Sequence, residues 1–348
     1  MRTTTSGHRH RFRVPAPPLV VIGLVFLILS ILHAVTFGPS DLSAKEVWDV
    51  VQHKLNLGPD PGLSALRTAT VWELRMPRVL VAAIAGAGLS LCGVIMQSLL
   101  RNPLAEPYLL GVSSGASTGA VLVLVMGIGG GLLTFPAGAF VGSITAFALT
   151  LLLSRLAGGT TDKIVLAGIA VTQGFSALTS FVIMIGADAN VTRGILYWLM
   201  GSFANVSWSE VTLLVGVLVV FLLLACAMAG PLDAFMFGEK EATTLGISVQ
   251  RTRVILLGFA ALMTAVIVAS SGAVGFVGLV LPHISRMLVG SRHRGLLPVS
   301  AILGAIFLIW ADTIARSVFS PLEVPVGVIT ALVGVPIFAT ILARTRKR

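Results

Sequence analysis

The side chains that could carry out chemistry inside this chain are few, and Asp312 is the foremost of them. It is the only acidic residue well inside a long apolar run, and Arg316 follows four positions later. Residues at that spacing share one face of a helix, where opposite charges attract. The acid could therefore form a structural ion pair with Arg316, or it could couple transport to an ion or proton gradient. One acid is a thin basis for ion-coupled transport, so we favour the ion pair.

The sequence lacks the motifs of common enzymes. None of its five lysines follows a glycine, which excludes a phosphate-binding Gly-x-x-x-x-Gly-Lys loop. Its six histidines include neither a His-Glu-x-x-His motif nor a helical pair spaced for zinc. We therefore expect no catalytic residue, no metal site and no cofactor in this chain. If ATP powers its function, a separate chain must hydrolyse the ATP.

Long apolar runs are the elements that must position these residues. Of the 348 residues, 56% are hydrophobic and 11% are charged, whereas a soluble domain has about 25% charged residues. The sequence predicts an all-α polytopic membrane protein, with one transmembrane domain over residues 18–343 and short tails at 1–17 and 344–348. About ten membrane-spanning helices are expected, near residues 18–36, 79–99, 108–127, 132–154, 164–186, 208–229, 252–270, 276–290, 297–316 and 325–343.

The positive charges predict the orientation of these helices. If both termini are cytoplasmic and the helices alternate in direction, 17 of the 24 lysines and arginines lie on the cytoplasmic side. Cytoplasmic loops of membrane proteins carry such an excess. The net charge of +10 then reflects topology, and it gives no reason to expect a nucleic acid partner.

The loop at 230–253 is cytoplasmic in this topology. It holds a short helix-like stretch, Glu239–Leu245, and Gly246 follows in the position that a helix C-cap glycine takes. A soluble helix that protrudes from a membrane domain could dock into an external ATPase. The alternative is a merely solvated loop.

Other connections also carry local signals. Pro103 and Pro107 stop helix propagation in the cytoplasmic turn RNPLAEPYLLGVSSGA. The stretch GAVGFVG at 272–278 predicts a turn or a broken helix. Two further short helices are expected outside the spans, in SAKEVWDVVQHKL at 43–55 and around RGILYWLMGSF at 193–203.

Several segments resemble the FecCD-type permeases of ABC importers for iron–siderophores, haem and vitamin B12. These are ELRMPRVLVAAIAGAGLSLCGVIMQSLLRNPLAEPYLLGVSSGA at 73–116, YWLMGSF at 197–203, GEKEATTLGI at 238–247, GAVGFVGLVLPHISRMLVGSRHRGLLPVS at 272–300 and ADTIARSVFSPLEVPVGVITALVGVPIF at 311–338. Phe237 departs from the pattern, since leucine is commoner before this Gly-Glu pair. The resemblance implies a type II importer fold with ten helices per subunit and two subunits, identical or homologous, around a central pathway.

The resemblance also implies partners and residue roles. A cytoplasmic ABC ATPase dimer would bind the loop at 230–250, and an extracytoplasmic binding protein would deliver the ligand. The residues that carry these roles are Gly238, Glu239, Ala242, Leu245 and Gly246 for ATPase coupling, Asn102 and Leu104 for a cytoplasmic gate, and Arg75, Arg78 and Arg316 for docking of the binding protein at an exposed rim. The alternatives are a rigid turn at 101–116 and arginines that only anchor the membrane interface.

The sequence therefore predicts a permease subunit in the cell membrane of a bacterium that imports an iron–siderophore, haem or cobalamin chelate. Siderophore is favoured by the breadth of the family alone. Met96, Met184 and Phe276 are candidates for the pathway wall, although helix packing is the favoured role for each of them. The alternative function is an ion-coupled secondary transporter that uses Asp312.

Overall fold

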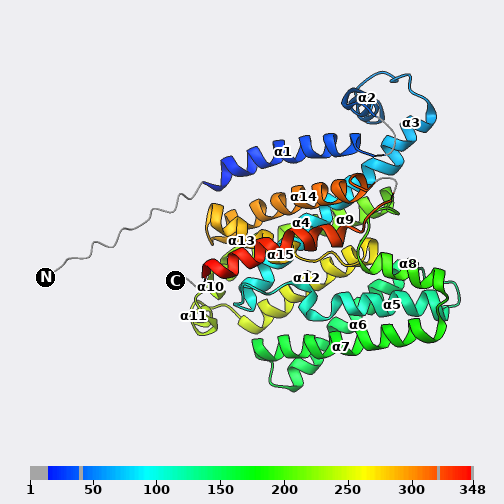
Figure 1. Cartoon of the computed structure of the whole chain (residues 1–348). Helices are drawn as coiled ribbons and strands as arrows, with labels where there is room; N and C mark the ends of the chain where they lie inside the picture. Colours follow the sequence, from blue (N-terminus) through cyan, green and yellow to red (C-terminus); the bar gives the residue numbers. More distant parts are fainter. Residues whose placement is uncertain (1–14, 39–41, 320–321, 346–348) are drawn as a thin grey trace.

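The computed structural model describes residues 15–38, 42–319 and 322–345, and within these ranges the chain is helical and has no strand. Ten apolar helices lie side by side (Figure 1), which confirms the predicted all-α membrane architecture. They are α1 (Ala16–Thr36), α4 (Met76–Leu99), α5 (Val112–Met126), α6 (Phe135–Leu156), α7 (Thr161–Gly186), α9 (Trp208–Ala227), α12 (Val249–Ser271), α13 (Val277–Val289), α14 (His293–Ser317) and α15 (Val326–Thr345). Among the described residues, seven helices are long and apolar enough to cross a membrane, while α5, α13 and the 326–341 part of α15 are shorter. The tail residues 1–14 and 346–348 lie outside this description.

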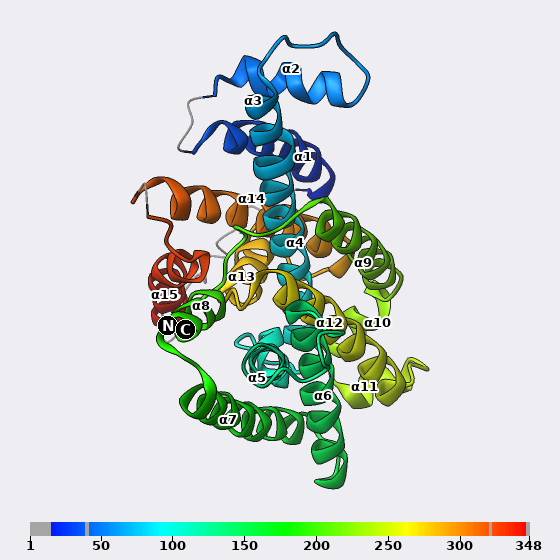
Figure 2. The ribbon, with the colours of Figure 1, turned by 90° about the vertical axis from the view of Figure 1, so that its right-hand side faces the viewer.

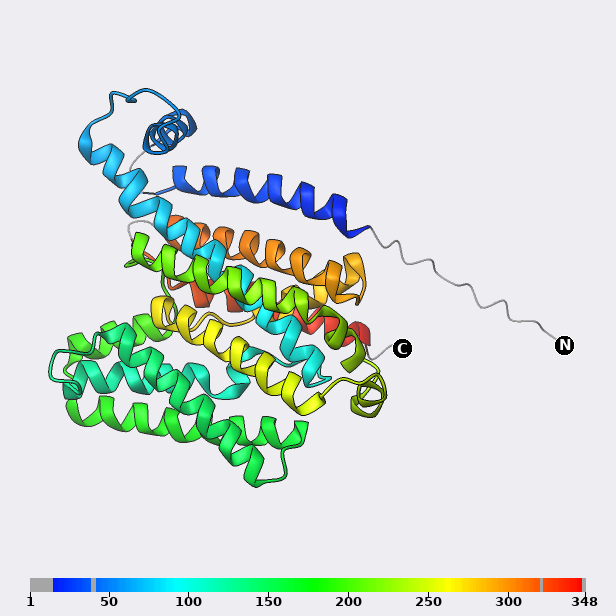
Figure 3. The same cartoon turned by 180° about the vertical axis from the view of Figure 1, so that it is seen from behind.

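Short helices mark the two ends of the bundle. At one end lie α2 (Ala44–Lys54), α3 (Ala65–Ala69) and α8 (Ala189–Leu199) (Figure 1). At the other end lie α10 (Ala229–Phe235) and α11 (Glu239–Thr244); the start of α1 and the end of α15 are at this end too (Figures 1 and 3). The expected helices in 43–55 and around 193–203 correspond to α2 and α8. A capping box between Ser43 and Glu46 starts α2.

Helix α4 runs through the middle of the bundle (Figure 2) and packs against α14, α13, α9 and α12. Its neighbours come so close that larger residues would not fit. A Cβ atom on Gly86 would lie 2.2 Å from the Gly304 carbonyl oxygen, and one on Gly93 would lie 1.9 Å from that of Gly278. Small residues permit such contacts between membrane helices. Helix α4 runs between the two ends of the molecule, and residues predicted to have functional roles lie near each of its ends: Arg75 and Arg78 at one, Asn102 and Leu104 at the other.

The predicted break at 272–278 separates α12 from α13. Gly272 and Phe276 both have positive φ angles, of 69° and 68°, so the chain leaves the helical conformation there. Of the candidates for the pathway wall, Met96 is fully buried, which agrees with the favoured role in helix packing and excludes it from the pathway. Met184 on α7 is 84% exposed, so it is available to a pathway or to a partner subunit.

Candidate functional site

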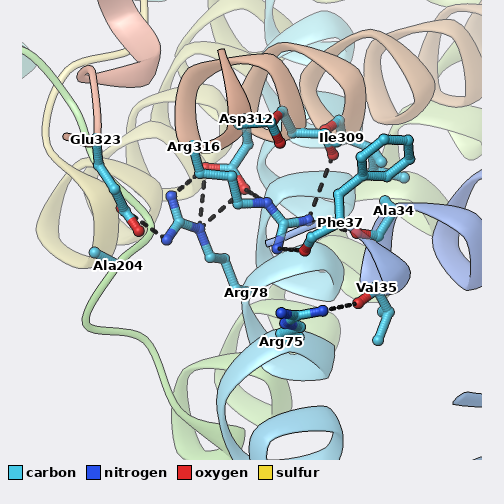
Figure 4. Close-up of polar contacts among 12 residues, drawn as sticks. Ala34, Val35, Phe37, Arg75, Arg78, Ala204, Ile309, Asp312, Arg316 and Glu323 are labelled. Atoms are coloured by element: carbon cyan, nitrogen blue, oxygen red, sulfur yellow. Dashed lines mark hydrogen bonds and ion pairs between the residues drawn. The ribbon is translucent and has the colours of Figure 1, made fainter. Parts of the chain in front are cut away.

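The first candidate region is a cluster of charged residues at the α2 end of the bundle. We call it the arginine cluster; it consists of Arg75, Arg78, Asp312, Arg316 and Glu323 (Figure 4). Arg78 at the start of α4 contacts Asp312 on α14 through two nitrogens, Nε and Nη2, each 3.0 Å from a carboxylate oxygen. Its Nη1 lies 2.9 Å from Glu323 Oε2. Arg78 thus bridges two carboxylates.

The ion pair between Asp312 and Arg316 exists, with 3.6 Å between Oδ2 and Nε. The i, i+4 spacing in the sequence therefore predicted the contact of Asp312 with Arg316, which is longer than its contact with Arg78. The closer partner, Arg78, is 234 positions away in the sequence, and no local pattern could identify it. With two arginines beside it, the buried Asp312 carboxylate is held in ion pairs.

Arg75 and Arg316 hold the C-terminal end of α1. Arg75 Nη1 donates to the carbonyl oxygens of Val35 and Thr36 at 3.0 and 2.9 Å. Arg316 Nη2 donates to the Ala34 carbonyl oxygen at 2.7 Å. The last carbonyls of a helix have no partner within it, and these cations satisfy them (Figure 4).

These contacts show that the three predicted docking arginines differ in their exposure. Arg75 and Arg316 are each 5% exposed, so the expectation that they lie at an exposed rim is wrong. Their positive charges are directed to α1 and Asp312. The side chain of Arg78 is 11% exposed and that of Glu323 is 36% exposed, so Arg78 and its acidic cover are the accessible part of the cluster. A docking role for these arginines stays a prediction.

The second candidate region is the coupling segment, residues 229–253, at the opposite end of the bundle. The predicted short helix is α11, and it begins at Glu239. Gly246 has a φ of 78° and donates to the Thr243 carbonyl at 2.9 Å, while Ile247 donates to that of Ala242 at 3.1 Å. This pair of bonds is the Schellman motif, which favours glycine at the left-handed position. The predicted C-cap glycine is confirmed.

Two side chains attach α11 to the rest of the chain, and two residues that flank it are exposed. Ala242 is fully buried, and Glu239, whose side chain is 47% exposed, pairs with Arg253 of α12. Leu245 is 68% exposed and Phe237 is 74% exposed. These two residues flank α11, one before its start and one at its C-cap, and exposed apolar groups of this kind can mark a surface that contacts another protein. Of the predicted coupling residues, Ala242 cannot contact a partner directly, and Phe237 was missed, although a large apolar residue in a charged loop was a signal.

The third candidate region is the turn at 100–106, which we call the gate turn. It directly follows α4, and Arg101 adopts a φ of 48°. Asn102 Oδ1 accepts a hydrogen bond from the backbone nitrogen of Leu104 at 2.9 Å, so the predicted local cap is present. Leu104 is 46% exposed. Burial raises the pKa of the Glu106 carboxyl at the end of the turn. The gate role of Asn102 and Leu104 stays a prediction.

Comparison with known proteins identifies the family of this chain. The sequence profile of the FecCD transport family matches residues 25–344. The chain belongs to the FecCD transport family. This membership, with the apolar helices, makes it a multi-pass permease subunit of an ABC transporter.

Relatives within the family have different cargoes. The chain is 39% identical to YvrB of Bacillus subtilis, the permease protein of an uncharacterized ABC transporter, over 94% of both chains. It is 34% identical to the hemin transport permease HmuU of Yersinia pestis, covering 95% of this chain and 97% of HmuU. It is 41% identical to the vitamin B12 permease BtuC of Vibrio cholerae, covering 84% and 88%.

A solved structure shares the fold of this FecCD permease. It is described as an inward-facing conformation of a metal-chelate type ABC transporter. The two agree with a TM-score of 0.81 at 29% identity, covering 94% of this chain and 99% of the other. The type II importer fold that the sequence predicted is confirmed.

Proposed function

We propose that this FecCD permease imports a metal chelate and that a separate ABC ATPase drives it through the coupling segment. The observation that carries the proposal is the construction of α11. The exposed Leu245 at its C-cap and the exposed Phe237 before its start offer apolar contacts to a partner. The ion pair of Glu239 with Arg253 and the burial of Ala242 transfer any force on those contacts to the bundle.

The proposed assembly has two permease subunits around a central pathway, an ATPase dimer on the cytoplasmic side and a binding protein on the outer side. The coupling segment, the start of α1 and the end of α15 lie at one end of the bundle (Figure 1). The distribution of lysine and arginine favours a cytoplasmic location for that end. The arginine cluster then faces outward, where Arg78 would contribute to docking of the binding protein.

The proposed cargo is a ferric siderophore, haem or cobalamin. The relatives carry hemin and vitamin B12, both large metal chelates. The siderophore is the first cargo to test, because the family resemblance favours it. An ion-coupled carrier based on Asp312 has less support, since two arginines already engage that carboxylate.

Reconstitution tests the proposal. The chain is placed in proteoliposomes with its ATPase and binding protein, and uptake of iron-55 siderophore, haem and cobalamin is measured. Uptake should require ATP on the side of the ATPase, and Leu245→Asp should abolish it. Leu132→Asp is the matched control, because Leu132 is an exposed leucine in the loop between α5 and α6. Concentration of a chelate by the chain alone, driven by an ion gradient, would overturn the proposal.

A further inference from the structure

Three polar side chains, one of them in the coupling segment, form one chain of contacts between three helices. Asp233 of α10 places Oδ1 2.6 Å from His293 Nδ1 and 2.9 Å from the His293 backbone nitrogen. His293, the first residue of α14, places Nε2 2.7 Å from Ser98 Oγ of α4. His293 is fully buried and Ser98 is 6% exposed. The Asp233 side chain is 36% exposed, so the network runs from the surface at α10 into the buried contact between α14 and α4.

The chemistry of the groups determines how the hydrogens are arranged. A carboxylate can only accept, so His293 Nδ1 carries a hydrogen and donates to Asp233. In a neutral imidazole, Nε2 then accepts the hydroxyl hydrogen of Ser98. In an imidazolium, Nε2 donates to Ser98 Oγ, which then donates to the Val94 carbonyl 2.8 Å away. The contacts are continuous in both protonation states.

These are the residue types of a hydrolytic triad, but a mechanical role fits the site better. A nucleophilic serine must meet its substrate, and Ser98 is enclosed between helices. What distinguishes the network is its position. Helix α10 is separated from α11 by residues 236–238, and Ser98 lies in the last turn of α4, directly before the gate turn.

We infer that the Asp233–His293–Ser98 network transmits displacement of the coupling segment to the gate turn. The inference rests on the proposed function. A shift of α11 moves α10, and a charge-assisted hydrogen bond, stronger than a neutral one, passes the shift to His293 and then to the end of α4. Backbone packing of α10 against α4 and α14 supports the same path. Asp233, His293 and Ser98 are thus positioning residues for the gate.

The first test needs no partner protein. Hydrogen–deuterium exchange is measured on the purified full-length chain in lipid nanodiscs. Ser98→Ala should increase exchange in α10 and α11 as well as at the end of α4, by about fivefold, the factor that the net loss of one typical hydrogen bond gives. Asp233→Ala should produce the reciprocal increase in the gate turn. Ser98→Thr keeps the hydroxyl and should restore protection.

Ser285→Ala is the matched control. Ser285 is fully buried, and its hydroxyl donates to the Leu281 carbonyl of its own helix, as Ser98 does to Val94. This variant should leave exchange in α10, α11 and the gate turn unchanged. If the change in each network variant stays within its own helix, the inference is wrong, whatever the fate of the proposed function.

The second test separates transmission from stability in the assembled transporter. Spin labels at Thr244 on α11 or at Leu104 in the gate turn report ATP-dependent distance changes between the two subunits. In Ser98→Ala, the change at Thr244 should persist and the change at Leu104 should be lost. Unaltered changes at both positions would overturn the inference. Absence of any ATP-dependent change at Thr244 in the unmodified protein would instead contradict the proposed function.

Discussion

The arginine cluster and the coupling segment lie at opposite ends of the bundle and use their side chains in opposite ways. In the cluster, Arg75 and Arg316 turn their charges inward, onto α1 and Asp312. In the coupling segment, the apolar Leu245 and Phe237 turn outward. A buried charge destabilises the fold unless it is paired, whereas an exposed apolar group contributes binding energy when a partner covers it. Substitutions in the cluster should therefore affect folding first, and substitutions in the coupling segment should affect assembly first.

The largest effect on stability is expected from Asp312→Ala in the arginine cluster. It leaves Arg78 and Arg316 without their shared buried carboxylate, and breaking a buried ion pair in this way costs about 3–5 kcal/mol. The free energy of unfolding in detergent micelles, from denaturant titration, measures the loss. Exposed ion pairs contribute up to about 1 kcal/mol. A loss smaller than that would contradict the stabilising role of the arginine cluster, because the cluster would then contribute no more than a surface ion pair.

A smaller and local loss of stability, confined to the end of α11, is expected from Gly246→Ala in the coupling segment. The left-handed φ of 78° costs about 1–2 kcal/mol for a residue with a Cβ atom. The strain falls on the end of α11, so global unfolding should change little while hydrogen exchange in residues 239–247 increases. Gly258→Ala is the control, since a Cβ atom on Gly258 meets no neighbour within 4 Å. Equal exchange in the two variants would show that the Schellman motif does not support α11.

Glu323→Gln tests a residue of the arginine cluster that is exposed enough to contact a partner. The carboxylate is partly exposed, so its loss should cost about 0–1 kcal/mol. It removes the acidic cover of Arg78, and the affinity for an acidic docking surface of the binding protein should rise. Surface plasmon resonance at two salt concentrations measures this. A fall in affinity would instead place Glu323 itself in the docking contact.

The smallest effect on stability is expected from Leu245→Asp. A surface substitution without a special structural feature usually changes the free energy of unfolding by less than about 0.5 kcal/mol. Stimulation of the ATPase by loaded binding protein should nevertheless be lost, because the apolar contact is lost. Normal ATPase stimulation together with normal stability would show that Leu245 does not take part in coupling to the ATPase.

Predictions for individual residues were confirmed where the interaction joins residues close together in the sequence. The short helix α11, its C-cap glycine and the cap between Asn102 and Leu104 were predicted, because these bonds join residues within five positions of each other. The inward direction of Ala242 and of Arg75 was not predicted, because the sequence around a small residue or a cation near a helix end does not show which side faces the core. Phe237 was noted in the sequence only as a departure from the family pattern, and in the structure its side chain is exposed.

The residues alone were enough to predict that the chain crosses a membrane many times, where its apolar helices lie and which family motifs they carry. These properties depend on local composition, and in a bilayer each spanning helix satisfies its own backbone. The contacts of Arg78 with Asp312 and of Ser98 with His293 join residues 234 and 195 positions apart and were found only in the packed structure. Such pairs arise where glycines let helices approach closely, so their geometry exists only once the helices have packed.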